Sequence, residues 1–273
     1  MEPQPTNVLA PIQLRIADDL RMKIERGELH PGDKLPSAQE LSQQWSCSPS
    51  SGRAAINLLK KQGLASGEQG QRPTVRIPPR RTVLRQDTNQ VEKDRVLLPE
   101  EKRRQFGSAE DNLKVSIHEL KFTTRYDRIP ASEDLANAFG VPIDTELLRR
   151  EYGCEDKKTG VLEQESVSYI PVDLIESNPA LFDPSKEPWP GGTQHQLYTV
   201  GIEIARMDTE VTAAMPTTVE AQRWDMADGV PLLCGRKLAI DTQGRVVEIS
   251  EARYPADRTK MLFSLTLTPW KKS

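Results

Sequence analysis

The sequence predicts an α+β protein that is divided into two domains. Its 273 residues are enough for two domains of ordinary size, each with its own core. Helical patterns with short turns, followed by one hairpin pattern, fill the first part of the chain up to residue 77. From about residue 113 onward, strand-like segments joined by turns outnumber helical ones, which is typical of an antiparallel sheet. We therefore expect a first domain at 1–77, a linker at 78–107 and a second domain at 108–273.

The composition excludes several classes of protein. Hydrophobic residues make up 36% of the chain and aromatic residues 5%, and no apolar run approaches the ~20 residues needed to cross a bilayer. The N-terminus lacks the layout of a signal peptide, so we expect a cytoplasmic protein without a membrane partner. The cysteines and histidines are widely scattered, which predicts reduced thiols, no disulfide framework, no metal site and no cofactor; these residues are Cys47, Cys154, Cys234, His30, His118 and His195.

The charge of the chain is unevenly distributed. Residues 1–86 carry 13 lysines and arginines against 8 acidic residues, whereas the remainder carries 24 against 32. A basic front and an acidic rear indicate that a polyanionic partner would meet the N-terminal part.

Two helices and a turn open the chain. Residues 11–26 place Ile12, Ile16, Leu20 and Ile24 on one stripe, as in an amphipathic helix, and Gly27 is a natural stop. After a Gly/Pro turn, the segment SAQELSQQW starts a second helix. Its Ser37 and Glu40 have the spacing of a capping box.

The third helix is predicted over residues 48–62. Ser48 suits the N-cap and Pro49 the first helical position. At 100° per residue, Gly52, Ala55, Ile56 and Leu59 gather on one side and Ser50, Arg53, Asn57 and Lys61 on the other. Glycine costs about 1 kcal/mol against alanine inside a helix, so an inward Gly52 indicates a close approach of a neighbouring helix.

A hairpin pattern follows Gly63, in LASGEQGQRPTVRI. Helix, helix, turn, helix and hairpin is the order of a winged helix-turn-helix, in which the helix after the turn enters the major groove of DNA. Spacing alone leaves a second interpretation open, a small three-helix core with a solvated polar face.

The segment IADDLRMKIERGELHPGDKLPSAQELSQQW, with SPSSGRAAINLLKKQGL after it, resembles the DNA-binding domain of GntR-family regulators over residues 14–77. Departures fall at contact positions: Pro49 replaces a usual arginine, Ser51-Gly52 replaces Thr-Val, and Arg53 is retained. The resemblance implies the DNA-binding residues Gln39, Ser48, Pro49, Ser50, Ser51, Arg53, Asn57, Gln69, Gly70 and Arg72. Lys60, Lys61 and Arg76 are candidate phosphate contacts, with plain solvated charge as the alternative.

Residues 78–112 are charged, bounded by prolines and without sustained periodicity, so we expect a connector with a short helix near 100–105. Beyond it, helices are predicted at SEDLANAFG, GTQHQLYTVG and TTVEAQRWDMADG. Strands are predicted at VSIHELKFTTRY, ELLRREYGCEDKKTGVLEQESVSYIP, IEIARMDTEVTAAMP, VPLLCGRKLAIDTQGRVVEISEARYPAD and LFSLTLTP. No catalytic motif appears among them, so an enzyme is not expected.

This rear part resembles the UTRA effector-binding domain of the HutC subfamily, above all in ADGVPLLCGRKLAIDTQGRVVEISEARYPADR. The resemblance covers about residues 108–268 and implies a chorismate-lyase-like fold that senses a small molecule. In an unbroken strand, Glu248, Ser250, Ala252 and Tyr254 share a face. The residues implied as effector contacts are Arg149, Arg150, Tyr152, Glu165, Tyr198, Glu248 and Tyr254.

Two points about this predicted site stay open. The family's first arginine falls on Arg150, and a slide of one residue would select Arg149 instead. Tyr152 stands where a second arginine is usual, which argues against a phosphosugar ligand because phosphate favours clustered donors.

We therefore predict a sequence-specific transcriptional regulator, a repressor, that binds double-stranded operator DNA as a symmetric homodimer and responds to a small-molecule effector of unknown identity. One alternative is a constitutive regulator, for instance of a mobile element, with a vestigial pocket. Another is an enzyme of the chorismate-lyase type.

Overall fold

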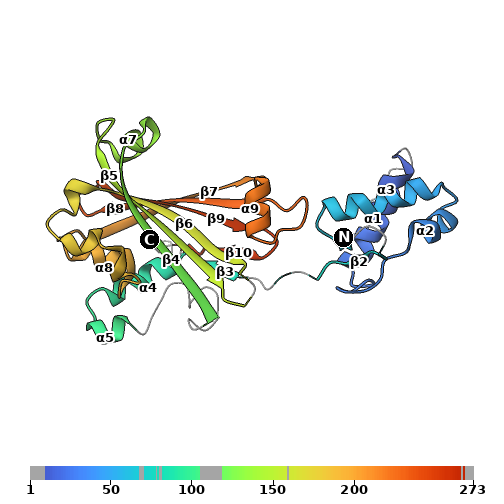
Figure 1. Ribbon diagram of the computed structural model, residues 1–273, viewed down its shortest axis with the longest axis horizontal. Helices are drawn as coiled ribbons and strands as arrows, with labels where there is room; N and C mark the ends of the chain where they lie inside the picture. The colour runs from blue at the N-terminus through green and yellow to red at the C-terminus, as the bar shows by residue number, and fades with distance from the viewer. Residues whose placement is uncertain are drawn as a thin grey trace, which may run out of the picture. The chain divides into compact units, whose positions relative to one another are not determined.

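The computed structural model describes residues 10–67, 71–77, 79, 82–104, 119–158, 160–265 and 267. The chain forms two compact units (Figure 1). One runs to position 80 and also includes residues 215–231. The other comprises residues 81–214 and the chain from 232 onward.

The N-terminal unit contains the three predicted helices, α1 (Ile12–Glu25), α2 (Ala38–Gln44) and α3 (Pro49–Lys61). Both α1 and α2 pack against α3. The predicted capping box is confirmed, since the Ser37 amide donates to Glu40 Oε2 at 2.7 Å and the Glu40 amide to Ser37 Oγ at 3.2 Å. The core between the helices holds Ile16, Leu20, Leu35, Leu41, Ala55 and Leu59, all at most 1% exposed.

A short hairpin completes this part of the unit. Strand β1 (Ala65–Ser66) pairs antiparallel with β2 (Thr74–Val75), as expected for a wing. The predicted contact residues Gln69 and Gly70 lie outside the described residues. Helix α9 (Thr218–Arg223) belongs to the same unit and is followed by the fully buried Trp224.

Gly52 lies where α3 passes closest to α2. A Cβ atom added there would be 2.6 Å from the Ala38 carbonyl oxygen and 3.2 Å from Leu41 Cβ. The expected close approach is therefore present, and it depends on the missing side chain.

We expect Gly52→Ala to destabilise the N-terminal unit. Alanine gains about 1 kcal/mol in helix propensity, but the overpacking against backbone costs about 1–3 kcal/mol. Urea unfolding followed by circular dichroism measures the balance, with Arg53→Ala on the exposed side of α3 as a neutral control. A Gly52→Ala protein more stable than wild type would contradict this interpretation.

The second unit is built on a six-stranded antiparallel sheet, as the sequence predicted. Its strand order is β4-β5-β6-β9-β8-β7, so consecutive hairpins are joined in the middle by β6 and β9. The strands are β4 (Leu120–Pro130), β5 (Glu146–Asp156), β6 (Leu162–Pro171), β7 (Ile204–Ala214), β8 (Leu232–Asp241) and β9 (Val246–Pro255).

Helices cover the two faces of this sheet. Helix α7 (Glu133–Phe139) begins at Ser132 and ends at Gly140, as expected, and packs on one core. Helix α8 (Gly192–Tyr198) packs on the other core through the fully buried Leu197. The chain reaches α8 through three 3₁₀ turns, at Val172–Leu174, Pro179–Phe182 and Pro184–Lys186.

The linker has more structure than its composition predicted. The expected short helix is confirmed as α5 (Glu100–Arg103), but β3 (Thr82–Arg85) and α4 (Thr88–Arg95) were not predicted. Strand β3 pairs in parallel with β10 (Thr259–Leu262). The expected closing strand LFSLTLTP is wrong, because β10 ends at Leu262 opposite the last residue of β3, and residues 263–265 are not in a strand.

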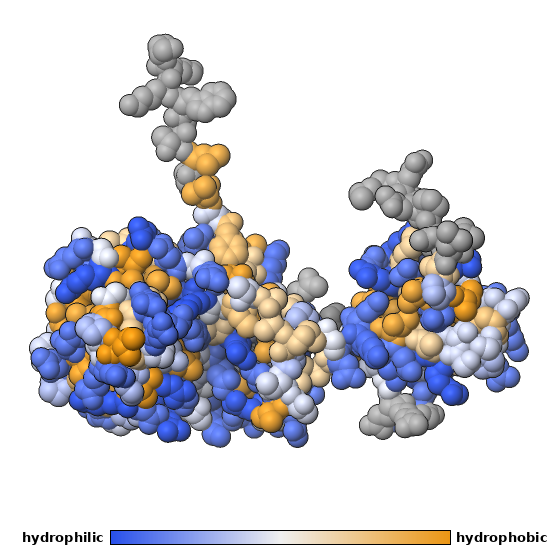
Figure 2. Space-filling model, turned by 90° about the horizontal axis from the view of Figure 1, so that it is seen from above, coloured by the Kyte–Doolittle hydropathy of each residue, from blue (hydrophilic) through white to orange (hydrophobic). Residues whose placement is uncertain are grey.

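Hydrophilic residues cover most of the face seen in Figure 2, and apolar residues appear there in small groups. In the described part of the chain, no helix has both the length and the apolar character needed to span a bilayer. None of the three cysteines, all of which lie in the described residues, forms a disulfide, and Cys154 is buried. Across the described ranges, no cluster of three potential metal ligands occurs.

Candidate functional site

The N-terminal end of α3 presents a group of hydroxyls. Ser48 caps the helix, and its Oγ lies 2.7 Å from Ser50 Oγ and 3.0 Å from Ser51 Oγ. The predicted polar face of α3 is exposed at Ser50, Arg53, Asn57 and Lys61, whereas the opposite face is buried. The side chains of Gln39, Ser48 and Pro49 are exposed as well.

Two of the candidate DNA contacts, Arg72 and Lys60, form hydrogen bonds within the N-terminal unit. Arg72 donates from Nε to the Leu35 carbonyl at 3.2 Å and from its guanidinium to Glu40 Oε2 at 2.8 Å. Hydrogen bonds from Ser37 and the charge of Arg72 lower the pKa of the Glu40 carboxyl. Lys60 donates to the Gly67 carbonyl. Arg72 therefore braces the base of the wing against α2.

In the second unit, a row of polar residues crosses the sheet on the side that carries α8. Directly paired positions on five neighbouring strands are Tyr126, Arg150, Ser168, Ser250 and Lys237. Residues that pair directly across an antiparallel ladder point to the same face. The register therefore brings together side chains that are far apart in the sequence.

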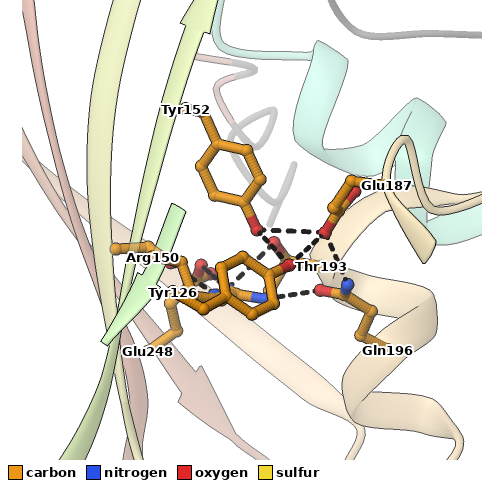
Figure 3. A network of polar contacts seen from close by, with 8 residues as sticks. Tyr126, Arg150, Tyr152, Glu187, Thr193, Gln196 and Glu248 are labelled. Carbon is orange, nitrogen blue, oxygen red and sulfur yellow. Dashed lines mark hydrogen bonds and ion pairs between the residues drawn. The ribbon is translucent and has the colours of Figure 1, made fainter. Parts of the chain in front are cut away.

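Arg150 is the centre of this row and is only 1% exposed. It forms a buried ion pair with Glu248, with 2.8 Å between its terminal nitrogen and Oε1. Arg150 also donates to Ser168 Oγ at 2.9 Å, Gln196 Oε1 at 2.6 Å and Thr193 Oγ1 at 3.4 Å. Figure 3 shows these side chains converging from the sheet and from α8.

Glu187 is a second centre, placed by the segment that precedes α8. Its Oε1 accepts from Tyr126 at 2.5 Å, Tyr152 at 3.1 Å and Gln196 at 2.9 Å. Its Oε2 accepts from the Trp189 backbone amide at 2.7 Å. We call the eight residues Tyr126, Arg150, Tyr152, Ser168, Glu187, Thr193, Gln196 and Glu248 the polar network.

Both tyrosines of the polar network keep their protons. Burial raises the pKa of Tyr126 to about 12, and burial also raises the pKa of Tyr152. Their hydroxyls therefore act as hydrogen-bond donors to Glu187 at neutral pH.

The structure brings together three of the seven predicted effector contacts, Arg150, Tyr152 and Glu248. Arg149 lies on the other face of β5, where it is bonded to Glu151 and lies 3.6 Å from Asp127. Of the two arginines that the sequence left open, Arg150 is the one in the polar network.

The other three predicted contacts lie apart from the polar network. Glu165 pairs with Gly153, on the Arg149 side of the sheet. Tyr198 is 48% exposed at the end of α8. Tyr254 lies four residues along β9 from Ser250, and burial raises its pKa.

Sequence reasoning missed five members of the polar network: Tyr126 and Ser168 on the strands, and Glu187, Thr193 and Gln196 near or on α8. Glu187 lies in a proline-rich segment between 3₁₀ turns, where no periodicity predicts which side chain points inward. Thr193 and Gln196 are three apart on a helix, a spacing that places them on one face. That spacing in GTQHQLY was the one available signal.

The N-terminal unit is a winged helix-turn-helix, and the second unit holds a polar network between its sheet and α8. This combination is typical of a DNA-binding regulator with a sensing domain. Two family descriptions match the chain: "Bacterial regulatory proteins, gntR family" over residues 12–75, and "UTRA domain" over residues 123–260. The chain belongs to the gntR family of transcriptional regulators and carries a UTRA effector-binding domain.

Two relatives align with this chain over most of their length. The chain is 25% identical to the uncharacterized HTH-type transcriptional regulator RB1450 of Rhizobium meliloti, over 90% of this chain and 92% of the relative. It is 26% identical to the HTH-type transcriptional repressor NagR of Bacillus subtilis, over 91% and 92%. A crystal structure described as a GntR-family transcriptional regulator superposes with a TM-score of 0.68 at 20% identity, covering 94% of this chain and 98% of that one, which shows a shared fold.

Proposed function

We propose that this regulator is a repressor that binds a pseudo-palindromic operator as a homodimer, and that its effector binds at the polar network. The polar face of α3 reads the operator, with Arg53 as the main base contact. The similarity to NagR, which is named a repressor, supports the direction of control. Two-fold proteins match two-fold sites, so the proposed dimer would require an operator with two half-sites.

The observation that carries the effector site is the buried Arg150–Glu248 pair with its bonded neighbours. Charged groups are rarely buried without a partner, and a buried pair costs desolvation energy that a well-packed apolar core avoids. A sensing domain gains from such groups because they give orientation and specificity to a bound ligand. The polar network is therefore the best-supported place for the effector.

The test combines a thermal-shift screen of metabolites with operator binding. A ligand that binds only the folded protein stabilises it by RT ln(1 + [L]/Kd), about 2.7 kcal/mol at a hundred times Kd. We expect an effector to raise the melting temperature of wild type and to weaken its complex with DNA from its own promoter in a gel shift.

The matched control for this screen is Tyr152→Phe, which removes one hydroxyl that donates to Glu187. A compound that stabilises wild type and Tyr152→Phe equally binds elsewhere, and this result would contradict the proposed site. A compound that stabilises wild type without changing operator affinity would contradict its role as an effector.

The charges of the polar network favour a ligand without phosphate. Arg150 is paired with Glu248 and Glu187 adds a second carboxylate, so the network carries one positive and two negative groups. A doubly negative phosphate would add to an existing excess of negative charge in a region of low dielectric. A neutral or positively charged ligand with several hydrogen-bond donors fits these acceptors better.

We expect inorganic phosphate to stabilise Glu248→Gln at least as much as wild type, because that change removes one negative charge beside Arg150. Differential scanning fluorimetry across a phosphate titration at constant ionic strength measures both shifts. If phosphate stabilises wild type but not Glu248→Gln, then Glu248 supports an anion site. That result would contradict the preference for a ligand without phosphate.

A further inference from the structure

Helix α8 is hydrogen-bonded on two sides. Toward the sheet, Gln196 accepts from Arg150 at 2.6 Å and donates to Glu187 at 2.9 Å. Toward the linker, Gln194 Nε2 donates to the Asn89 carbonyl of α4 at 2.8 Å. Both glutamines are buried, 2% and 6% exposed. Figure 1 shows α4 next to α8.

The linker helix α4 is held at two further points. Lys237, a member of the polar row across the sheet, donates to Asn89 Oδ1 at 3.3 Å. Lys93 donates to the Ile204 carbonyl at 2.7 Å and lies 2.8 Å from Glu203. Polar contacts therefore fasten both the first and the second turn of α4 to the sensing unit.

These contacts are what makes α4 a helix. It has eight residues, none of them fully buried, and its N-cap residue Asp87 makes no side-chain capping bond. An isolated helix shorter than ~12 residues is marginal in water. Elements with few buried residues open at the lowest free energies in a protein, and small changes in their contacts shift the balance between folded and open states.

We propose that α8 transmits the state of the polar network to the linker, by holding α4 docked through Gln194 or releasing it. This inference rests on the proposed effector site, since an effector would act by rearranging Gln196 and Thr193 on the inner side of the same helix. The two side chains flank Gln194 in a helix of seven residues. A shift of α8 that accommodates a ligand therefore moves the Gln194–Asn89 bond.

From α4 the connection continues toward the DNA-binding unit along the chain. Helix α4 follows β3 after Gln86 and Asp87. Arg85 is paired with Asp87 at 2.9 Å, and the Gln86 amide donates to the Leu262 carbonyl at 3.1 Å. The ladder between β3 and β10 has only four residue pairs, so it is sensitive to the loss of an adjoining helix.

Amide hydrogen exchange of the full-length protein tests the coupling without a known effector. Glu248→Gln perturbs the polar network, Gln194→Leu removes the α8–α4 bond, and the double variant completes a cycle. Gln194 is hydrogen-bonded to Glu92 of α4 as well as to Asn89. We therefore expect Gln194→Leu to speed the exchange of residues 88–95 at least fivefold, as the loss of these hydrogen bonds would. We expect Glu248→Gln to change exchange in 88–95 in the wild-type background and much less in the Gln194→Leu background.

The control is Gln90→Leu, the same chemical change on the exposed side of α4, where Gln90 donates to Asp94. It should leave the effect of Glu248→Gln on residues 88–95 in place. If Glu248→Gln impairs folding, Thr193→Val removes a weaker contact to Arg150 and serves as the perturbation.

The proposal is overturned if the network variant changes α4 exchange equally with and without Gln194, or if Gln194→Leu leaves α4 as protected as in wild type. Neither result bears on whether an effector binds at the polar network, which the thermal-shift screen tests separately. The opposite combination is also informative. If the exchange cycle shows coupling but no ligand in the thermal-shift screen depends on Tyr152, the transmission through α8 stands and the effector site is rejected.

Discussion

Replacing Arg150 with methionine is expected to lower the free energy of unfolding of the sensing unit by about 3–5 kcal/mol. Methionine removes the charge while keeping much of the volume, so Glu248 remains buried without its partner. The loss of hydrogen bonds to Ser168 and Gln196 adds to the cost. Chemical unfolding followed by far-UV circular dichroism, with the transition of the second unit fitted separately, measures the change.

The neighbouring arginine supplies a matched control. Arg149 carries the same charge one residue earlier, but it lies on the other face of β5 in a partly exposed pair with Glu151. Such pairs contribute about 0–1 kcal/mol, so Arg149→Met should change stability little. Equal losses for the two variants would contradict the central place of Arg150.

The second half of the pair refines this prediction. Removing both charges with Arg150→Met and Glu248→Leu should give a protein more stable than Arg150→Met alone, because Glu248 is then no longer left buried without its partner. The double variant should nevertheless lose any response to an effector. This combination would separate the contribution of the pair to folding from its contribution to sensing.

The three helices at the start of the N-terminal unit could be predicted almost residue by residue, whereas the inclusion of residues 215–231 in that unit was not foreseen. Its helices are amphipathic with clear caps, and the same local signals that start and stop them also fix which side faces the core. Ser37, Ser48 and Gly52 each have the expected role, because each depends on neighbours within a few residues or on one closely packed helix.

The polar network could be predicted only where a strand carried it. Alternation along β9 placed Glu248 on a chosen face, whereas Arg150 and Tyr152 on β5 were expected from the family resemblance, with Arg149 as the alternative to Arg150. The strand register then brought these side chains together. Glu187 has no such periodicity, since it lies in a segment without regular structure. Helix α4 was missed for a related reason: its stability comes from contacts with α8 and β8 rather than from a pattern of its own.

An Arg53→Ala variant is expected to bind the operator much more weakly than wild type while folding normally. Arg53 is exposed on the polar face of α3, one turn from the hydroxyl group of serines at its start. An arginine that reads guanine through two hydrogen bonds contributes about 1–3 kcal/mol of discrimination. Because Pro49 offers no side-chain donor, Arg53 carries more of the base recognition, and a dimer would lose the contact in both half-sites.

The most direct test of this account is the ratio of affinities for the promoter operator and for a scrambled duplex, measured by fluorescence anisotropy at fixed salt. We predict that Arg53→Ala reduces this ratio at least tenfold, as the loss of one base contact in each of two half-sites implies. Lys61→Ala, an exposed charge on the same helix, should weaken both complexes about equally, as expected for a phosphate contact. An unchanged ratio in a folded Arg53→Ala protein would contradict the claim that α3 reads the operator through Arg53.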